Sequence, residues 1–185
     1  IACAGSGKTE VLAQRIANIL SQPGVRPANV IAFTFTEKAA AELKERVHRT
    51  VTAKLPGIVG LAEMYIGTMH GFCLDLLQTY IPETFKYGVL TDITQQLLID
   101  RETNKSGFNT AVKTVQGVES SLRRYTDTRV FKGALSILQE DAVDFGLVPP
   151  ETTASLAKYK DFLADKRYFD YTSMMVEAVG FLERS

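Results

Sequence analysis

IACAGSGKTE, residues 1–10, decides the fold of this chain, because a glycine-rich segment that ends in Lys8 and Thr9 is typical of a phosphate-binding loop. Such a loop follows a strand and opens a helix, and apolar side chains recur at helical spacing from residue 11 to residue 20. Only the last residues of a possible strand precede the loop. We therefore expect an α/β fold whose first strand is cut short at Ile1.

The loop residues have the chemistry that a polyphosphate requires. Backbone N–H groups from residue 4 to residue 9 can wrap phosphate oxygens at a helix N-terminus, where Gly5 and Gly7 permit a close approach. Lys8 would reach the β- and γ-phosphates, and the Thr9 hydroxyl would bind Mg²⁺. The alternative is a glycine-rich turn that only caps a helix. The predicted nucleotide-binding residues are Ala4, Gly5, Ser6, Gly7, Lys8, Thr9 and Glu10, with Lys8 and Thr9 as catalytic residues.

The rest of the first half alternates between strand and helix patterns. Residues 30–35, VIAFTF, are short, apolar and rich in strand formers, as a parallel strand covered on both faces should be. Residues 37–51 return to helical spacing, and residues 63–69 and 70–80 repeat the strand and the helix. This order predicts a parallel sheet with right-handed crossovers.

The second half has a different pattern. A connection with Pro and Gly covers residues 81–90, and from residue 91 to residue 166 no strand is predicted. Four stretches there have helical patterns, with starts at Asp92, at Ser106 or Asn109, at Thr128 and at Pro150. We expect a partial P-loop domain at residues 1–90, an all-helical insertion at 91–166, and a helix at 167–185 that returns to the first domain.

The composition is that of an ordinary soluble globular protein, with 45% hydrophobic and 23% charged residues. Lys plus Arg number 21, as do Asp plus Glu, and this balance neither supports nor excludes nucleic acid. No apolar run approaches the roughly 18 to 20 residues that cross a bilayer, and no signal peptide opens the chain. Cys3 and Cys73 are too few for a disulfide framework or a zinc site. We expect a cytoplasmic protein with no membrane partner.

Three stretches, taken together, resemble the first motifs of superfamily 1 DNA helicases of the UvrD/Rep/PcrA kind. They are IACAGSGKTEVLAQRI (1–16), IAFTFTEKAAAELKERV (31–47) and IGTMHGFCLDLL (66–77). Those enzymes also carry Ala where the strict phosphate-loop pattern has its first glycine, which is Ala2 here. Their second motif, T-F-T-N-K-A-A-x-E-[ML]-x-x-R, is matched over residues 34–46, with Glu37 in place of the usual Asn.

Two further stretches extend the resemblance. The third motif of the family, G-T-[FM]-H-[GS], is matched over residues 67–71, where Gly67 and Gly71 would bracket a strand-to-helix turn. FDYTSMMVEAV, residues 169–179, resembles the helix that precedes the Asp-Glu motif of the family, with Tyr171 in place of a more common acidic or apolar residue.

The resemblance implies a RecA-like motor domain that binds ATP and Mg²⁺ and moves 3′ to 5′ along single-stranded DNA towards a duplex junction. It assigns Phe35 to stacking on a base, which is worth about 1–3 kcal/mol. It assigns Thr68 and His70 to the sugar-phosphate backbone, and contacts without base readout suit movement on any sequence. The implied DNA-binding residues are Phe35, Thr36, Lys38, Thr68 and His70.

Four of these residues also have a plainer interpretation, which for Phe35 is a place in the core beside Phe33. Thr36 is equally suited to cap the following helix, and Lys38 is either a phosphate contact or a solvated side chain. A lone His such as His70 is often a surface or capping residue. The residues expected in the core are Phe33, Met69 and Phe72. Arg123, Arg124, Arg129 and Lys132 cluster across a loop, either as a solvated face or as contacts to the phosphates of a duplex.

Hydrolysis requires more than a phosphate loop. An Asp holds Mg²⁺, a Glu orients the attacking water, and arginines stabilise charge on the γ-phosphate. Asp-Glu does not occur in the chain, and Glu140–Asp141 lies in a helical pattern. We therefore expect a helicase fragment that binds ATP and DNA without turnover. Two alternatives remain, a P-loop kinase of a small metabolite and a non-catalytic DNA- or protein-binding module. DNA repair is one of several pathways open to the parent protein.

Overall fold

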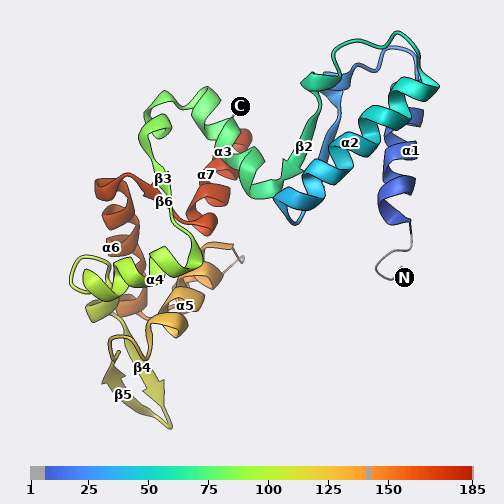
Figure 1. Ribbon diagram of the computed structural model, residues 1–185. Helices are drawn as coiled ribbons and strands as arrows, with labels where there is room; N and C mark the ends of the chain where they lie inside the picture. Colours follow the sequence, from blue (N-terminus) through green and yellow to red (C-terminus); the bar gives the residue numbers. More distant parts are fainter. Residues whose placement is uncertain (1–6, 141–142, 185) are drawn as a thin grey trace. The chain divides into compact units, whose positions relative to one another are not determined.

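The structure, a computed structural model, describes residues 7–140 and 143–184 (Figure 1). The chain divides into two compact units, Ile1–Phe72 and Cys73–Ser185. The division falls inside helix α3 (Met69–Tyr80), whereas the sequence pattern changes near residues 90 and 166. The three-part organisation expected from the sequence stays a prediction.

The first unit is a small α/β arrangement. Helix α1 (Lys8–Leu20), strand β1 (Ile31–Thr34), helix α2 (Glu37–Lys54) and strand β2 (Tyr65–Thr68) follow one another, with the 3-10 turns η1 (Pro27–Asn29) and η2 (Leu61–Glu63) before each strand. The strands β1 and β2 are parallel neighbours, as the crossover pattern predicts. They are the whole of the sheet in this unit's described residues, so a larger RecA-like sheet stays a prediction.

One face of this sheet is covered and the other is open. Helices α1 and α2 pack on each other, and their apolar sides enclose Ala32 of β1 and Ile66 of β2. The two neighbours of Ala32 in β1 point the opposite way, and Ile31 is 53% and Phe33 42% exposed. The expectation of a strand covered on both faces is therefore wrong for β1, because the side chains on its second face stay largely exposed among the described residues.

The three residues expected in the core have mixed outcomes. Phe33 and Phe72 pack edge to face with each other and with Tyr65, at centroid separations of 5.0 to 6.1 Å. Phe72 is half-buried there, but Phe33 keeps much of its ring in solvent. Met69 is 50% exposed at the first position of α3. The core expectation is wrong for Phe33 and Met69, because the described residues cover only part of the Phe33 ring and leave Met69 exposed at the start of α3.

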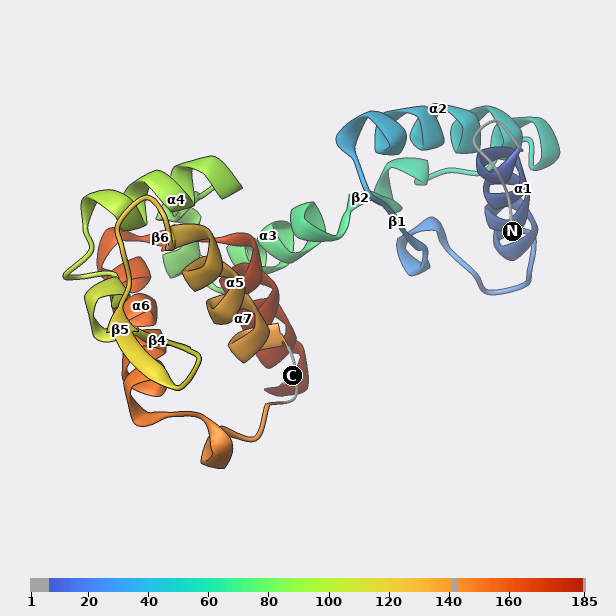
Figure 2. The ribbon, with the colours of Figure 1, turned by 90° about the horizontal axis from the view of Figure 1, so that it is seen from below.

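The second unit is mainly helical. Its helices are α4 (Asp92–Arg101), α5 (Thr128–Glu140), α6 (Pro150–Lys166) and α7 (Tyr171–Arg184), and the rest of α3 opens it. The strands β3 (Gly88–Val89) and β6 (Tyr168–Phe169) form a short parallel pair, and the 3-10 turns η3 (Pro82–Lys86), η4 (Phe108–Thr110) and η5 (Phe145–Leu147) lie in the connections. Figure 2 shows α5 and α7 side by side, in agreement with their contacts.

Two clusters of buried side chains stabilise this unit. The larger is centred on fully buried Tyr159 and Phe108 and joins α4, α5 and α6. The smaller joins Cys73 and Leu77 of α3 to Met174 of α7. Burial raises the pKa of the Cys73 thiol, so it stays protonated among these apolar side chains. None of the described helices combines the length and apolar composition that crossing a bilayer requires.

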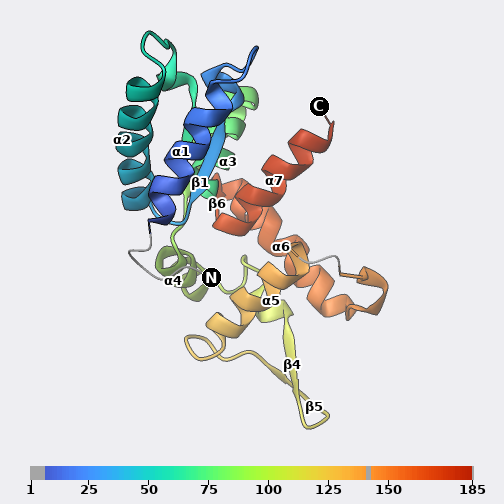
Figure 3. The same ribbon diagram turned by 90° about the vertical axis from the view of Figure 1, so that its right-hand side faces the viewer.

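The insertion is not all helical, which corrects the sequence-based expectation. Strands β4 (Val112–Val115) and β5 (Val118–Ser121) form an antiparallel hairpin that projects from the helices of this unit (Figure 3). Gln116 and Gly117 at its tip both have positive φ, 51° and 80°, as a two-residue type I′ turn requires. The helix starts expected at Asp92, Thr128 and Pro150 are confirmed, and the one at Ser106 or Asn109 is wrong.

Candidate functional site

The parallel register of β1 and β2 brings two predicted DNA-binding segments to one edge of the sheet. Thr34 and Thr68 are register partners at the carboxyl ends of the two strands. The chain continues from them into the first turns of α2 and α3, which carry the other candidate residues. Ligands of open α/β folds bind at this end of parallel strands. The first unit therefore gathers Phe35, Thr36, Lys38, Thr68 and His70 around one strand edge.

Phe35 is the most exposed large apolar side chain of this edge. Its relative exposure is 104%, so the ring contacts water over its whole surface. It follows directly after β1, where the backbone turns towards α2. Burying an aromatic ring of this size is strongly favourable, and both faces of this ring are free for a planar partner. The position suits the stacking role that the sequence predicts.

Thr36 caps α2, so the plainer interpretation of this residue is confirmed. Its hydroxyl oxygen accepts a hydrogen bond from the Ala39 amide at 3.1 Å, and its backbone is extended with φ −136° and ψ 149°. Its carbonyl oxygen accepts a second bond from the Thr34 hydroxyl at 3.1 Å. A contact between Thr36 and DNA stays a prediction. Lys38 lies exposed in the same turn, which suits either of its two interpretations.

Thr68 connects the two strand ends through its side chain. Its hydroxyl donates to Oε1 of Glu37 at 2.8 Å and accepts from the Gly71 amide at 3.1 Å. The hydroxyl thus caps α3 and also holds the first residue of α2. His70 is half-buried in the first turn of α3. The expected strand-to-helix turn is confirmed, since β2 ends at Thr68 and α3 begins at the next residue.

The two glycines of this turn leave room for one tyrosine. The Tyr65 hydroxyl donates to the Thr68 carbonyl oxygen at 2.9 Å, so its ring lies along the strand. A Cβ atom on Gly67 would lie 2.5 Å from the Tyr65 hydroxyl oxygen, and one on Gly71 would lie 2.9 Å from it. Real Cβ contacts are essentially never so short. The glycines are therefore required by the Tyr65 side chain, which the sequence motif did not indicate.

The end of the phosphate loop opens a helix, as predicted. Gly7 has φ 77° and ψ 9°, a left-handed conformation that favours glycine, and α1 begins at the next residue. Thr9 is half-buried in the first turn, while Glu10 is exposed and pairs with Arg46 at 3.5 Å. Ala4, Gly5, Ser6 and the side chain of Lys8 lie outside the described residues. A left-handed glycine at the N-terminus of a 13-residue helix fits an anion such as a nucleotide phosphate.

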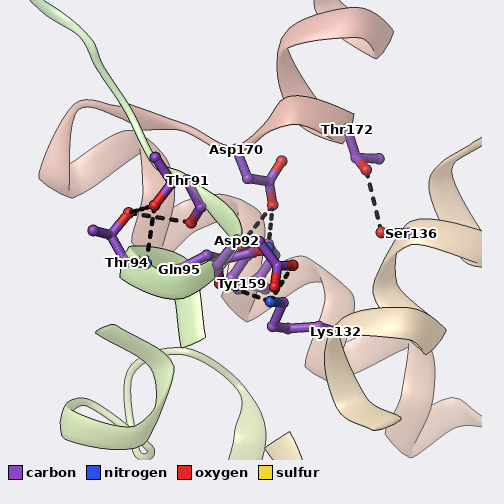
Figure 4. A network of polar contacts seen from close by, with 9 residues as sticks. All are labelled: Thr91, Asp92, Thr94, Gln95, Lys132, Ser136, Tyr159, Asp170 and Thr172. Carbon is purple, nitrogen blue, oxygen red and sulfur yellow. Dashed lines mark hydrogen bonds and ion pairs between the residues drawn. The ribbon is translucent and has the colours of Figure 1, made fainter. Parts of the chain in front are cut away.

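A buried polar network organises the second unit at FDYTSMM, residues 169–175 (Figure 4). Asp170 is 3% exposed, and its Oδ2 accepts from the Tyr159 hydroxyl at 2.6 Å and from Nε2 of Gln95 at 2.8 Å. Its Oδ1 accepts from the Ser173 amide at 2.7 Å. Burial, followed by the charge of Asp170, raises the pKa of Tyr159 far above its usual range. Asp170 thus joins α4, α6 and the start of α7.

The four cationic side chains predicted as a cluster do not share one environment, as Lys132 and Arg124 show. Lys132 is 7% exposed, and its ammonium group donates to the carboxylate and the carbonyl oxygen of Asp92 (Figure 4). This pairing lowers the pKa of the Asp92 carboxyl. The guanidinium of Arg124 lies 4.6 Å from the centroid of the Tyr125 ring. Lys132 is therefore neither a solvated residue nor available to a phosphate, and the expected cluster of four is wrong at this position.

Comparison with known proteins identifies a protein family whose members are similar to this chain. Residues 1–184 match the family described as the UvrD/REP helicase N-terminal domain. A probable DNA helicase of Mycoplasma pneumoniae is 28% identical over 185 residues, which are 97% of this chain and 33% of that protein. The ATP-dependent DNA helicase PcrA of Staphylococcus aureus is 31% identical over 194 aligned positions, which are all of this chain and 24% of that protein.

PcrA of Staphylococcus epidermidis is similar to the same degree, with 30% identity over 195 aligned positions that cover 100% of this chain and 24% of that protein. The chain thus spans between a quarter and a third of the length of these curated relatives. The match runs through both compact units, so it includes the hairpin and the buried network as well as the phosphate loop.

Proposed function

This chain belongs to the UvrD/REP helicase N-terminal domain family, and from that membership we propose that it binds ATP with Mg²⁺ and grips single-stranded DNA as part of a DNA helicase. Its homologues are DNA helicases, which supports an enzyme of that type. The family match leaves the small-metabolite kinase without a supporting observation. Movement from 3′ to 5′ towards a duplex junction belongs to the proposal for the parent protein.

The nucleotide part of the proposal rests on the start of α1. The left-handed Gly7 and the N-terminus of the 13-residue helix α1 favour an anionic ligand. Thr9 would hold Mg²⁺ through its hydroxyl, and Lys8 would neutralise charge on the β- and γ-phosphates. Bound ATP would supply the free energy of movement. We propose that this chain by itself does not turn ATP over, since it contains no Asp-Glu pair after an apolar strand.

The DNA part of the proposal is carried by one observation, the fully exposed ring of Phe35 at the edge where β1 and β2 end in register. A base would stack on this ring, and Thr68 and His70 would lie along the sugar-phosphate backbone. Contacts of this kind do not depend on base identity, so they suit a protein that moves along any sequence. In the parent protein, nucleotide-driven closure of two motor domains would alternately tighten and release this grip.

Replacement of Phe35 tests the proposal. We expect Phe35→Ala to weaken binding of a fluorescein-labelled oligo-dT strand at least about 5-fold, since stacking contributes about 1–3 kcal/mol per base. The measurement is fluorescence anisotropy at low and at moderate salt. The control is Phe85→Ala, which removes another exposed ring, 73% accessible, from η3. Equal affinities of the two variants and the unmodified chain would refute the stacking role.

A further inference from the structure

A carboxylate lies among the residues proposed to grip DNA. Glu37, the first residue of α2, is exposed, and its Oε1 accepts the Thr68 hydroxyl at 2.8 Å. The two residues are 31 positions apart in sequence and meet because β1 and β2 end in register. The contact therefore joins the two segments from which the proposed DNA site is built.

The Thr68 hydroxyl has one proton, and the contact with Glu37 determines whether that proton is available to a phosphate. A threonine hydroxyl has one proton to donate and two lone pairs that accept. One lone pair of Thr68 accepts from the Gly71 amide, and the single proton goes to Glu37. A phosphate oxygen can only accept a hydrogen bond. The Thr68 hydroxyl therefore has no proton for a phosphate while it is bonded to Glu37.

We propose that Glu37 competes with the DNA backbone for the Thr68 hydroxyl and thereby weakens the grip of this site on single-stranded DNA. This inference rests on the proposed function, because it identifies a residue that sets the affinity of the same site. Two acceptors, the carboxylate and a phosphate, share one donor, so the strand binds through Thr68 only after the bond to Glu37 is broken. The carboxylate also brings a negative charge to a site for a polyanion.

The sequence supports the same conclusion independently. Glu37 stands where the helicase motif resembled by residues 34–46 usually carries Asn. A carboxamide is neutral and has two N–H donors, so it can itself bond to a phosphate oxygen. A carboxylate has no donor and repels the phosphate. At the N-terminus of α2, however, a carboxylate interacts favourably with the helix dipole, so Glu37 stabilises the fold while it opposes the ligand.

The test compares two neutralising substitutions on one helix in the full 185-residue chain. We expect Glu37→Gln to tighten binding of a labelled oligo-dT strand by about 3- to 10-fold, the range of one net hydrogen bond. Glu42→Gln makes the same change of charge at an exposed position of α2, and we expect it to leave the affinity within about 2-fold of the unmodified chain. Thermal melts verify that all variants are folded.

A second variant separates the hydrogen bond from the charge. Glu37→Asp keeps the negative charge, but its side chain is shorter by one methylene group, so we expect its carboxylate not to reach the Thr68 hydroxyl. Competition for the hydroxyl predicts tighter binding for Glu37→Asp, which withdraws the acceptor, and for Glu37→Gln, whose neutral amide oxygen is a weaker acceptor than a carboxylate. If only Glu37→Gln binds more tightly, charge alone is responsible, and competition for the hydroxyl is wrong.

The outcomes also separate this inference from the proposed function. If the unmodified chain binds DNA, and Phe35→Ala weakens it, but Glu37→Gln has the affinity of Glu42→Gln, the inference is wrong and the proposed function stands. If neither the unmodified chain nor Glu37→Gln binds the strand, both fail. A gain for Glu37→Gln and Glu37→Asp that persists in Thr68→Ser and disappears in Thr68→Val supports the inference, because serine keeps the hydroxyl and valine removes it.

Discussion

At the scale of single residues, the turn after β2 depends on the absence of a side chain at Gly67. The Tyr65 ring passes over this position to reach the Thr68 carbonyl oxygen, and it packs on Phe33 and Phe72 along the way. The Tyr65 hydroxyl oxygen and two of its ring carbons would lie within 2.9 Å of a Cβ on Gly67. The backbone of Gly67 has an ordinary negative φ, so the constraint is spatial and does not come from the backbone conformation.

We expect Gly67→Ala to lower the free energy of unfolding by about 1–3 kcal/mol, as overpacking at a tight contact does. The new methyl group would displace the Tyr65 ring and break its bond to the Thr68 carbonyl. Urea unfolding followed by circular dichroism measures the change. The control is Gly133→Ala in α5, where a Cβ would meet nothing within 4 Å and a helical alanine adds about 0.5–1 kcal/mol of stability. Equal stabilities for the two variants would contradict the spatial argument.

At the level of single residues, the sequence predicted the position of Phe35 but not the bond between Glu37 and Thr68, and the difference has a physical reason. Motif position identified Phe35 as a residue of a strand tip, and the structure places it fully exposed there. The bond between Glu37 and Thr68 was not predicted, since only the register of two strands brings these side chains together. A polar contact between distant segments depends on the fold, and local patterns contain no information about it.

At the scale of secondary-structure elements, the β4–β5 hairpin shows how one spacing can suit two structures. Apolar residues of this segment recur three or four positions apart, as on a helix, at Phe108, Ala111, Val115, Val118 and Leu122, and Val112 adds one more. β-branched side chains and the Gln116–Gly117 turn instead favour a hairpin. The two strands lie mostly in solvent, so burial does not enforce either periodicity there. Turn geometry decided the outcome, and the sequence signal for it was weak.

Asp127 stabilises the base of this hairpin through two hydrogen bonds. Its Oδ2 accepts from the Lys113 ammonium of β4 and from the Arg123 amide, both at 2.7 Å. The hydrogen bond from Lys113, followed by that from the Arg123 amide, lowers the pKa of the Asp127 carboxyl below its usual value. A two-stranded hairpin is marginally stable by itself, so it depends on contacts of this kind.

The lowered pKa gives a pH prediction with a definite sign. A carboxyl group whose pKa is depressed in the folded state contributes stability above its unfolded pKa of about 3.9, and this contribution is lost as the pH falls through the folded value. We expect Asp127→Asn to melt at a lower temperature than the unmodified chain at pH 7, and the two melting temperatures to converge below about pH 4. Differential scanning calorimetry over this pH range makes the measurement.

Asp161→Asn is the control for that experiment, because Asp161 is exposed on α6. Its melting temperature should follow that of the unmodified chain at every pH. A constant difference between Asp127→Asn and the unmodified chain from pH 7 to pH 3 would show that the ionised carboxylate does not hold the hairpin.

At the scale of the whole molecule, the two compact units differ in what stabilises their cores. The first unit is closed by apolar residues of α1, α2 and the two strands. The second unit adds a buried carboxylate, Asp170, whose oxygens accept bonds from α4, α6 and the first turn of α7. Removing the charge from such a group leaves donors without an acceptor in a site that excludes water.

We expect Asp170→Asn to lower the free energy of unfolding by about 2–4 kcal/mol, since the amide nitrogen would face the Tyr159 hydroxyl and the Gln95 amide. Chemical denaturation gives the magnitude, and hydrogen exchange of backbone amides gives the location, with faster exchange expected in α4, α6 and α7. The matched control is Asp165→Asn, an exposed position of α6. Unchanged amide exchange in those helices would show that the hydrogen bonds of Asp170 do not stabilise them.

The order of motifs predicted the family and the parallel strand pair, which the family match and the strand register confirm. It did not predict the role of Asp170, although FDYTSMM was noticed as part of the resemblance. The distinction is physical. A phosphate loop or a strand-end segment has local requirements on residue type, whereas the partners of the buried carboxylate come from other helices, 11 positions away in sequence for Tyr159 and 75 positions away for Gln95.

The exposure of Phe35 has a practical consequence. The chain contains no tryptophan, so an indole placed there by Phe35→Trp would be the sole one in the molecule. Because the side chain touches no neighbour that a larger ring would displace, its emission would respond to what approaches the strand edge and little else. The proposed binding of a nucleic acid strand can thus be followed optically from inside the candidate site, in real time and without a dye on either partner.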